Sequence, residues 1–587
     1  MPILTKVLDR VNSPEDLKKL NCEEMKELAS EMRELIINKV NTTGGHFGPN
    51  LGIVEATIAL HYVFNSPIDK FVFDVSHQCY PHKILTERKE GFTNPETYLK
   101  YTGYTAPEES EHDLFKVGHT STSVSLATGL AKGRDLLGGS ENVIAIIGDG
   151  SLTGGEALEG LNNAATLGSN IIIVVNDNDM SIAENQGGIC EHLTALRYTN
   201  GNLENNLFKS LGFDYYYVSE GNNIEKLIEA FLKVKDTNHP VIVHIHTIKG
   251  KGFEPAEVNK EPFHWILPGA LNKLNEPQGD YGEDYNSVTK DYLLNKVQEG
   301  MPIVAINAAT PGVFGWDKTF RDKMDSHYID VGIAEQQAVG MASGIAKRGG
   351  KAVMGVMSSF IQRTYDQLSQ DLALNNSPVT ILVFWGGISS ADATHLCTFD
   401  IPLVCNIPNL VYLAPTNKEE YLKMLDWSVN QNEHPILIRV PANFTYLGHE
   451  DNTDYSVLNK FQMTECGEKI AIIGLGSFYD KAKELKSALK EKLGINSTLI
   501  NPKFITGIDS EMLKGLKSSH KLVITLEDGE LDGGFGEKIS RFYGNSDMKV
   551  LNYGSFKEFT DRTSINELYS RYRLTSELII EDIKKIL

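Results

Sequence analysis

Short apolar runs recur along the chain, and the stretches between them have the length and polarity of amphipathic helices. Continuous apolar strands that alternate with such helices are typical of parallel sheets covered by helices on both faces. The pattern therefore predicts an α/β fold. The clearest predicted strands are Val143–Ile147, Ile171–Val175, Val241–Ile245, Ala352–Val356, Val379–Phe384, Leu410–Leu413, Lys469–Ile473 and Lys521–Leu526.

Two polar stretches rich in Gly and Asn, Leu271–Asn286 and Leu447–Asp454, separate these strands into three groups. A chain of 587 residues is also too long for one hydrophobic core. We therefore expect two linkers and three domains, each a mostly parallel sheet flanked by helices. The predicted domains are residues 1–280, 285–445 and 455–587.

Composition excludes several classes of partner. The chain has 77 acidic and 56 basic residues, a net charge of −21, which argues against nucleic acid or an anionic membrane surface as a partner. No apolar run is long enough to span a bilayer, and the first residues lack the features of a secretory signal. The six cysteines form no CxxC pair, so neither a zinc site nor a disulfide framework is indicated. We expect a cytoplasmic protein with reduced thiols.

Small residues that carry oxygen follow two of the predicted strands. Asp149 lies in a GDG tripeptide and Asn178, 29 residues later, in an NDN tripeptide, with room for a crossover helix at about Gly155–Leu167. The carboxyl ends of neighbouring parallel strands meet at one edge of a sheet, where ligands bind. Carboxylate and amide oxygens suit Mg²⁺, and glycines such as Gly150 let a diphosphate approach the backbone. The two tripeptides together predict a site for Mg²⁺ and a diphosphate.

GDGSLTGGEALEGLNNA followed by NDNDMSIAEN resembles the thiamine diphosphate motif of transketolase-like enzymes, in particular that of the 1-deoxy-D-xylulose-5-phosphate synthase family. Five further segments resemble that family in the same order: GGHFGPNLGIVEATIALHYVFN, DVSHQCYPHKILT, KVGHTSTSVSLATGLA, KGKGFEPAE and DVGIAEQQAV. The resemblance implies a homodimeric enzyme that uses thiamine diphosphate and Mg²⁺. It would decarboxylate pyruvate and join the product to an aldehyde such as D-glyceraldehyde 3-phosphate, for isoprenoid or thiamine biosynthesis.

The resemblance also implies which residues hold the cofactor. Asp149, Asn178 and the main chain of Met180 would bind Mg²⁺. Glu335 matches the glutamate that binds a ring nitrogen of the cofactor, so we expect it to be buried with a raised pKa. Taken alone, Glu335 would equally suit a helix N-terminus, and Phe360, matched to the aromatic residue that stacks on the cofactor, would suit a core. The implied cofactor-binding residues are His77, Gly118, His119, Asp149, Gly150, Ser151, Asn178, Met180, Lys249, Glu335 and Phe360.

Histidines would move protons in such a reaction, because their pKa lies near neutrality. The catalytic set that the resemblance implies is Glu335, His46, His77, His119 and His395. His46 lies in GGHFG, which we interpret as a flexible loop. The substrate-binding residues that the resemblance implies are His46, His264, Arg363, Asp392, His395 and Lys503.

The chain departs from the family pattern at the expected substrate site. Gln337 stands where the family usually has a histidine, Trp385 and Lys503 stand in place of arginines, and Met357 replaces a tyrosine. Neither Trp nor Lys reproduces the two-point fork with which Arg binds phosphate. Either another cation restores phosphate binding, or the acceptor is a different, unphosphorylated aldehyde.

A segment between Gln186 and Phe213 is a few dozen residues shorter than in typical members of the family, where it forms a mobile loop region near the active site. Two other functions stay open. One is ketol transfer of the transketolase type, and the other is a non-catalytic protein that binds thiamine diphosphate. Glu335 argues against the second, because a sensor has no need for a carboxyl group that activates the cofactor.

Overall fold

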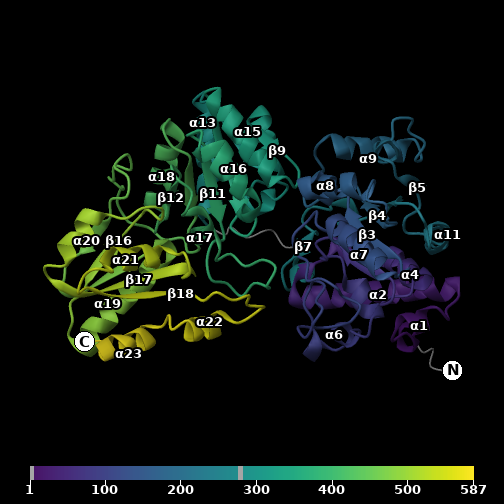
Figure 1. The fold of residues 1–587 in the computed structure, drawn as a ribbon, viewed down its shortest axis with the longest axis horizontal. Helices are drawn as coiled ribbons and strands as arrows, with labels where there is room; N and C mark the ends of the chain where they lie inside the picture. The colour runs from purple at the N-terminus through teal and green to yellow at the C-terminus, as the bar shows by residue number, and fades with distance from the viewer. Residues whose placement is uncertain (1–5, 275–281, 587) are drawn as a thin grey trace. The chain divides into compact units, whose positions relative to one another are not determined.

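The structure is a computed structural model that describes residues 6–274 and 282–586 (Figure 1). The chain divides into two compact units. The N-terminal unit comprises Met1–Asp280 and Gly332–Ala334, and the C-terminal unit comprises Tyr281–Val331 and Glu335–Leu587.

The N-terminal unit is built on one parallel sheet of five strands. Helices α4 (Val54–Val63) and α11 (Ile224–Val234) pack on one face of this sheet, and α7 (Ser123–Leu137) and α8 (Gly155–Ala164) pack on the other. Because both faces are covered, the central strands are buried along almost their whole length and are mostly apolar, as expected from their sequences. In spatial order the strands are β2 (Lys70–Phe73), β3 (Val143–Gly148), β4 (Ile172–Asp177), β6 (Val241–His246) and β5 (Asp214–Val218).

The C-terminal unit contains two sheets. The first has six parallel strands, in the order β12 (Val411–Leu413), β13 (Ile436–Arg439), β11 (Thr380–Phe384), β10 (Lys351–Met357), β8 (Ile303–Asn307) and β9 (Tyr328–Asp330). The second has the order β14 (Gln462–Glu465), β16 (Thr498–Asn501), β15 (Lys469–Gly474), β17 (His520–Glu530) and β18 (Lys549–Ser555), with only the edge strand β14 antiparallel.

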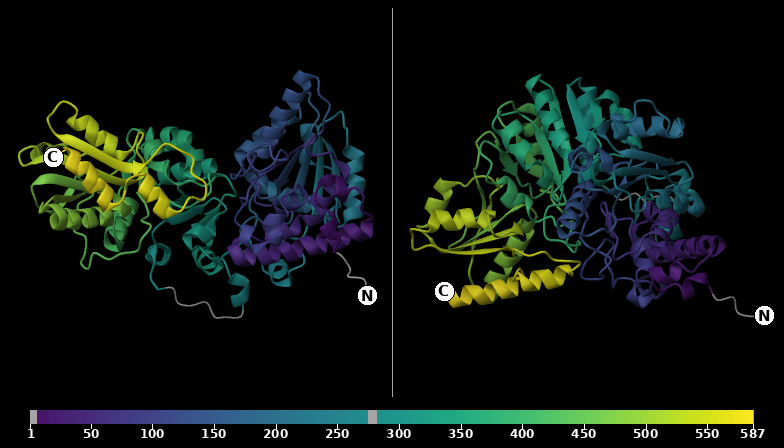
Figure 2. Two further views of the ribbon diagram at one scale, coloured as in Figure 1. Left: turned by 90° about the horizontal axis from the view of Figure 1, so that it is seen from below. Right: turned by 45° about the vertical axis from the view of Figure 1, so that its right-hand side comes forward.

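Helices also cover the sheets of the C-terminal unit. Helix α15 (Glu335–Lys347) packs on one face of the first sheet, and α13 (Tyr285–Gln298) and α18 (Lys418–Asn430) pack on the other. Helices α19 (Tyr479–Leu493) and α23 (Ser576–Ile586) cover one face of the second sheet (Figure 2). Three mostly parallel sheets flanked by helices confirm the predicted fold class. The predicted domain boundaries and the homodimer stay predictions.

The two predicted linkers differ in what the structure describes. Of Leu271–Asn286, residues 275–281 lie outside the described part of the chain, and α13 begins at Tyr285. Leu447–Asp454 contains no helix or strand. It is nevertheless anchored, because the Asp451 carboxylate accepts a hydrogen bond of 2.5 Å from the Tyr455 hydroxyl.

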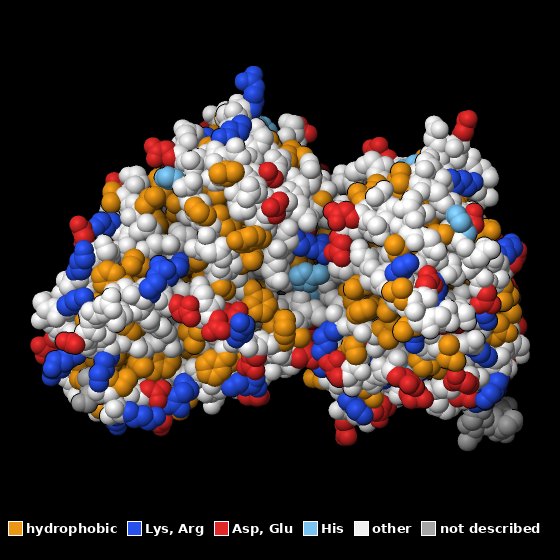
Figure 3. Space-filling view, viewed as in Figure 1, with side chains coloured by type: hydrophobic (Ala, Val, Ile, Leu, Met, Phe, Trp, Pro, Cys, Tyr) orange, Lys and Arg blue, Asp and Glu red, His pale blue; other side chains and the backbone are white. Residues whose placement is uncertain are grey.

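All six cysteines are free thiols. Within residues 6–274 and 282–586, no helix is both long enough and apolar enough to cross a membrane. On the face drawn in Figure 3, acidic and basic side chains are interspersed, without an extended basic patch.

Candidate functional site

Asp149 and Asn178 lie at the ends of two neighbouring strands, as predicted. Strands β3 and β4 pair in parallel with Gly148 opposite Asn176, so the residues that follow them share one edge of the sheet. Both side chains are buried. The Asp149 carboxylate accepts hydrogen bonds from the main-chain N–H of Met180, at 3.2 Å, and from the side-chain amide of Asn185, at 2.7 Å.

This edge has the properties of a cation site. The Asn178 Oδ1 atom is buried and has no hydrogen-bond partner among the described residues. Burial, together with the neighbouring Asp177, raises the pKa of Asp149 to about 7. A divalent cation would give the unpaired oxygen a partner and the buried carboxylate a counter-charge. The described residues hold no cluster of three or more His, Cys, Asp or Glu side chains, so a cation here would also need amide and main-chain oxygens.

Gly150 and Ser151 directly follow Asp149 in the chain. A Cβ atom at Gly150 would lie only 2.7 Å from the Ser181 hydroxyl, so this position admits no larger side chain without rearrangement. Ser151 begins a short 3₁₀ turn and is buried, and its carbonyl accepts a hydrogen bond of 2.8 Å from the Ser121 hydroxyl. The absence of a side chain at Gly150 thus lets the Ser181 segment pack against it, and the diphosphate-binding role of Gly150 and Ser151 stays a prediction.

Three histidines that are far apart in the sequence form one cluster. The ring centroids of His46 and His77 are 5.0 Å apart, and each ring lies 5.5 Å from that of His264. The interpretation of the His46 segment as a flexible loop is wrong. His46 belongs to strand β1 (Gly45–His46), which pairs with β7 (Trp265–Ile266) in a small antiparallel sheet.

Asn50 positions two of these histidines, although we did not predict a role for it. Its fully buried side-chain amide donates to the carbonyls of His46, at 3.0 Å, and His77, at 2.7 Å. Its oxygen accepts from the N–H of Tyr80, at 2.9 Å. Asn50 lies within the segment that resembles the family, but a single asparagine in such a segment does not indicate which backbone it binds.

Lys249 connects the histidine cluster with the strand ends. Its ammonium nitrogen lies 3.0 Å from His264 Nδ1 and also donates to the carbonyl of Ser181. Burial lowers the pKa of Lys249 to about 7. Burial, and then the charge of Lys249, lower the pKa of His264 well below its usual value.

Gly118 and His119 lie on a segment whose following residues are hydrogen-bonded to Asp74. This buried carboxylate accepts hydrogen bonds from the N–H groups of Ser121 and Ser123, at 2.8 and 2.9 Å. Gly118 is buried and His119 is half-buried.

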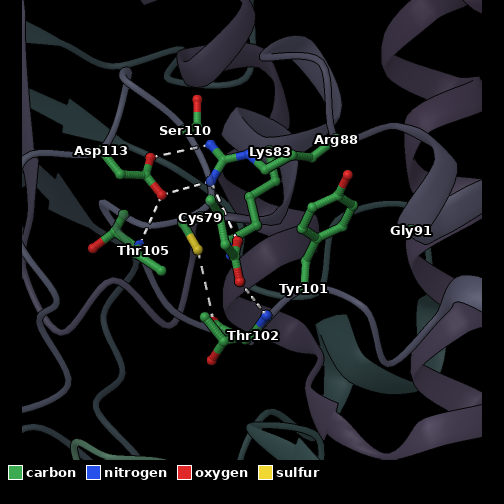
Figure 4. Close-up of polar contacts among 12 residues, drawn as sticks. Cys79, Lys83, Arg88, Gly91, Tyr101, Thr102, Thr105, Ser110 and Asp113 are labelled. Carbon is green, nitrogen blue, oxygen red and sulfur yellow. Dashed lines mark hydrogen bonds and ion pairs between the residues drawn. The ribbon is translucent and has the colours of Figure 1, made fainter.

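A buried network around Asp113 anchors the chain that leads to Gly118 (Figure 4). The Arg88 guanidinium donates to both Asp113 oxygens, at 2.5 and 3.0 Å, and the Asp113 carboxylate also accepts from the N–H of Ala106. His82, on α5 (Tyr80–Leu85), lies 2.8 Å from Asp113. Since His77 comes just before α5, the network joins the two segments that carry His77 and His119.

This network predicts acid sensitivity of the N-terminal unit. Burial lowers the pKa of His82 to about 4, although Asp113 opposes the shift. The unfolded chain, with a histidine pKa of about 6.5, then binds the proton more readily. The stabilisation is present above about pH 6.5 and is lost as the pH falls through about 4, at a cost of up to about 3 kcal/mol. Hydrogen exchange of α5 amides between about pH 7 and about pH 5 would measure it.

The His82→Gln variant is expected to show a shallower pH dependence of exchange than the unaltered protein. His239→Gln is the matched control, because His239 is in the same unit and half-exposed. An unchanged slope in His82→Gln would contradict the assignment.

In the C-terminal unit, Glu335 has the environment expected for it. It is the first residue of α15 and is buried, with 3% of its surface exposed. Its Oε2 atom has no hydrogen-bond partner among the described residues, and Arg363 Nη1 lies 3.8 Å away. Burial raises the pKa of Glu335 despite the charge of Arg363. The expected burial and raised pKa are confirmed.

Other predicted residues follow the carboxyl ends of strands in the six-stranded sheet of the C-terminal unit. Phe360 follows β10, and His395 lies on the segment that follows β11. Their ring centroids are 5.8 Å apart. Asp392 Oδ1 lies 3.7 Å from His395 Nδ1, and this histidine lowers the pKa of Asp392 to about 2 against the effect of burial. The structure thus gathers predicted residues here, whereas their roles stay predictions.

Lys503 is placed differently from our expectation. It is buried, and its ammonium nitrogen lies 3.2 Å from Glu420 and 3.3 Å from Asp451. A buried ammonium requires such counter-charges. The placement argues against a phosphate-binding role for Lys503. Trp385, by contrast, is 57% exposed, so it is not a core residue.

The shortened segment is helical where it begins. Helix α9 (Gly188–Tyr198) carries Arg197, which binds Asp177 and Asp179 at the end of β4. Neither Arg197 nor Asn185 was predicted to take part in the site. Asn185 closes the NDNDMSIAEN motif, whereas Arg197 lies outside every segment quoted for the resemblance.

Comparisons with known proteins show which family the chain resembles along its length. The family model described as "1-deoxy-D-xylulose-5-phosphate synthase" matches residues 8–202 and 199–247. The pyrimidine binding domain of transketolase matches residues 284–445, and the transketolase C-terminal domain matches residues 459–579. The first match breaks at residues 199–202, within the shortened segment.

Curated relatives match along the whole chain. Proteins named 1-deoxy-D-xylulose-5-phosphate synthase from Lachnoclostridium phytofermentans and Halothermothrix orenii are each 37% identical. The matches cover 99% of this chain and 99% and 97% of those proteins. The solved transketolase from Campylobacter jejuni is 16% identical, with 96% of this chain and 100% of its own covered, and has a TM-score of 0.43.

Proposed function

Because the chain belongs to the 1-deoxy-D-xylulose-5-phosphate synthase family, we propose that it decarboxylates pyruvate and joins the product to D-glyceraldehyde 3-phosphate. The cofactors would be thiamine diphosphate and Mg²⁺. The observation that carries this proposal is the buried Asn178 oxygen, which has no partner among the described residues and directly follows β4, together with the buried Asp149 carboxylate, which directly follows the neighbouring strand β3. Hard oxygen donors of this kind suit Mg²⁺ that also holds phosphate oxygens.

Each group of residues has a defined task in this proposal. Asp149, Asn178 and the Met180 carbonyl would hold Mg²⁺, with Gly150 and Ser151 against the diphosphate. When bound, thiamine diphosphate supplies the carbon nucleophile that attacks the keto group of pyruvate.

Glu335 would share a proton with a ring nitrogen of the cofactor. Its raised pKa supports this task, because burial favours the protonated carboxyl group. Phe360 would lie against the same ring, and Arg363 would keep the carboxyl group oriented from 3.8 Å away.

The histidine cluster would deliver the proton that the new hydroxyl group requires. The lowered pKa of His264 keeps its ring neutral near pH 7, and its Nδ1 atom lies 3.0 Å from the Lys249 ammonium group. Lys249, with a pKa of about 7, is partly protonated at neutral pH and can act as the acid of this cluster, with the neutral His264 ring beside its ammonium group. His46 and His77 complete the cluster, each with its ring centroid 5.5 Å from that of His264.

We further propose that the enzyme is a cytoplasmic homodimer. The family resemblance implies the dimer. Light scattering of the purified protein would measure its oligomeric state.

An unphosphorylated acceptor is the second candidate. The observation that favours it is the pairing of Lys503 with Glu420 and Asp451, which occupies a cation that could otherwise bind phosphate. Arg363 is the remaining predicted cation at the carboxyl ends of the first sheet.

Release of CO₂ from pyruvate that is radiolabelled in its carboxyl group distinguishes these functions. We expect release that depends on thiamine diphosphate, with D-glyceraldehyde 3-phosphate among the best acceptors. Faster turnover of D-glyceraldehyde by about tenfold or more in kcat/KM would favour the unphosphorylated acceptor. Consumption of a ketose donor but never of pyruvate would favour ketol transfer. A protein that binds the cofactor and turns over neither donor would contradict an enzymatic role.

A further inference from the structure

Arg197 binds the residues on both sides of Asn178. Its Nη1 atom donates to the two carboxylate oxygens of Asp177, at 2.7 and 2.6 Å, and its Nη2 atom donates to Asp179, at 2.6 Å. Nη2 also donates to Thr194 Oγ1, one turn earlier on α9, at 2.8 Å. One guanidinium group thus ties the end of β4 and the turn after it to a helix.

We propose that Arg197 is a positioning residue for the Mg²⁺ site, which it serves by holding Asn178 in its binding orientation. This inference rests on the proposed function and adds to it a residue that does not contact the cation.

The turn after β4 needs such support. Asp179 has a φ angle of 61°, in the left-handed region that costs free energy for residues other than glycine. The carbonyl of Asn178 accepts a hydrogen bond of 2.9 Å from Lys260, and His244 lies 2.9 Å from Asp177. With the main chain held in this way, the only buried side-chain atom of Asn178 without a partner among the described residues is Oδ1.

Arg197 could instead act only through its charge, and the two roles predict opposite results. The positive charge repels a cation, so its removal by itself would strengthen Mg²⁺ binding. Loss of the guanidinium hydrogen bonds to Asp177 and Asp179 would let these residues move and would weaken Mg²⁺ binding. Lysine keeps the charge but cannot bridge two carboxylates with a rigid fork. Arg197→Lys therefore separates geometry from charge.

The test is calorimetric titration of Mg²⁺ into protein that has been stripped of metal and then supplied with thiamine diphosphate. The unaltered protein, Arg197→Lys and Arg197→Gln are compared. We expect both variants to raise the dissociation constant by about 10–100-fold, as loss of an orienting partner does at other metal sites. At saturating Mg²⁺ and cofactor, kcat should stay within about threefold of the unaltered value, because Arg197 touches no reacting group.

Arg134→Gln is the matched control. Arg134 is a buried arginine of α7 that binds Asn170, just before the other end of β4, so its loss disturbs the same strand away from the site. Arg134→Gln should lower the thermal midpoint without changing Mg²⁺ affinity beyond about threefold.

Two outcomes would overturn the inference while leaving the proposed function in place. One is a Mg²⁺ affinity of the Arg197 variants that stays within about threefold of the unaltered protein, and the other is tighter Mg²⁺ binding by Arg197→Gln. Failure of the unaltered protein to bind Mg²⁺ and cofactor would overturn both.

Discussion

Replacement of Glu335 by Gln is expected to lower kcat for pyruvate by about 10²–10⁴-fold, the range for loss of a positioned acid–base group. The amide keeps the size of the side chain but cannot share a proton with the cofactor ring. The affinity for thiamine diphosphate should change much less, since the residues at the strand ends of the N-terminal unit are untouched. Steady-state CO₂ release and calorimetric titration of the cofactor would measure the two quantities separately.

Glu299→Gln is the matched control for this experiment. Glu299 lies at the end of α13 in the same unit, with 60% of its side chain exposed, so the same substitution there should leave kcat unchanged. A Glu335→Gln enzyme that retains more than about a tenth of the activity would contradict the acid–base role of Glu335.

Replacement of Asp149 by Asn is expected to weaken Mg²⁺-dependent binding of thiamine diphosphate by at least about 100-fold, because even loss of an outer partner can cost 10–100-fold at a metal site. The amide keeps one oxygen for the N–H of Met180 but removes the buried negative charge that a cation would neutralise. Titration of cofactor with and without Mg²⁺ would show whether the loss is confined to the Mg²⁺-dependent part.

Asp214→Asn serves as the control for Asp149→Asn. Asp214 begins β5 of the same sheet, with 60% of its side chain exposed. Equal losses of affinity in both variants would indicate general destabilisation, and no loss in Asp149→Asn would contradict a metal site at this edge.

The features that the sequence predicts well are those that depend on regular periodicity. Buried strands of a parallel sheet are almost continuously apolar, so their runs are visible in the sequence. The proximity of Asp149 and Asn178 follows from the same regularity, because one crossover helix places the ends of β3 and β4 side by side. The burial of Glu335 was predicted from the chemistry that the family resemblance implies.

Features that depend on contacts between distant residues could not be predicted. The β1 strand of His46 has two residues and pairs with Trp265 and Ile266 more than 200 residues later, so no period reveals it. The pairing of Lys503 depends on Glu420 and Asp451, both far away in the sequence.

Arg197 is hidden for a related reason. Its helical context indicates only a partly buried basic residue, and its partners lie on a turn whose shape is set by the end of β4. The same holds for Asn50, whose three hydrogen bonds are all to backbone groups.

A crystal structure of the protein with thiamine diphosphate and Mn²⁺, in which anomalous scattering locates the ion, tests the central claim most directly. We predict that the ion is bound by Asp149, Asn178 and the carbonyl of Met180, and that the carboxyl group of Glu335 faces the cofactor ring. An ion bound elsewhere, or a Glu335 side chain that points into solvent in the complex, would contradict the account.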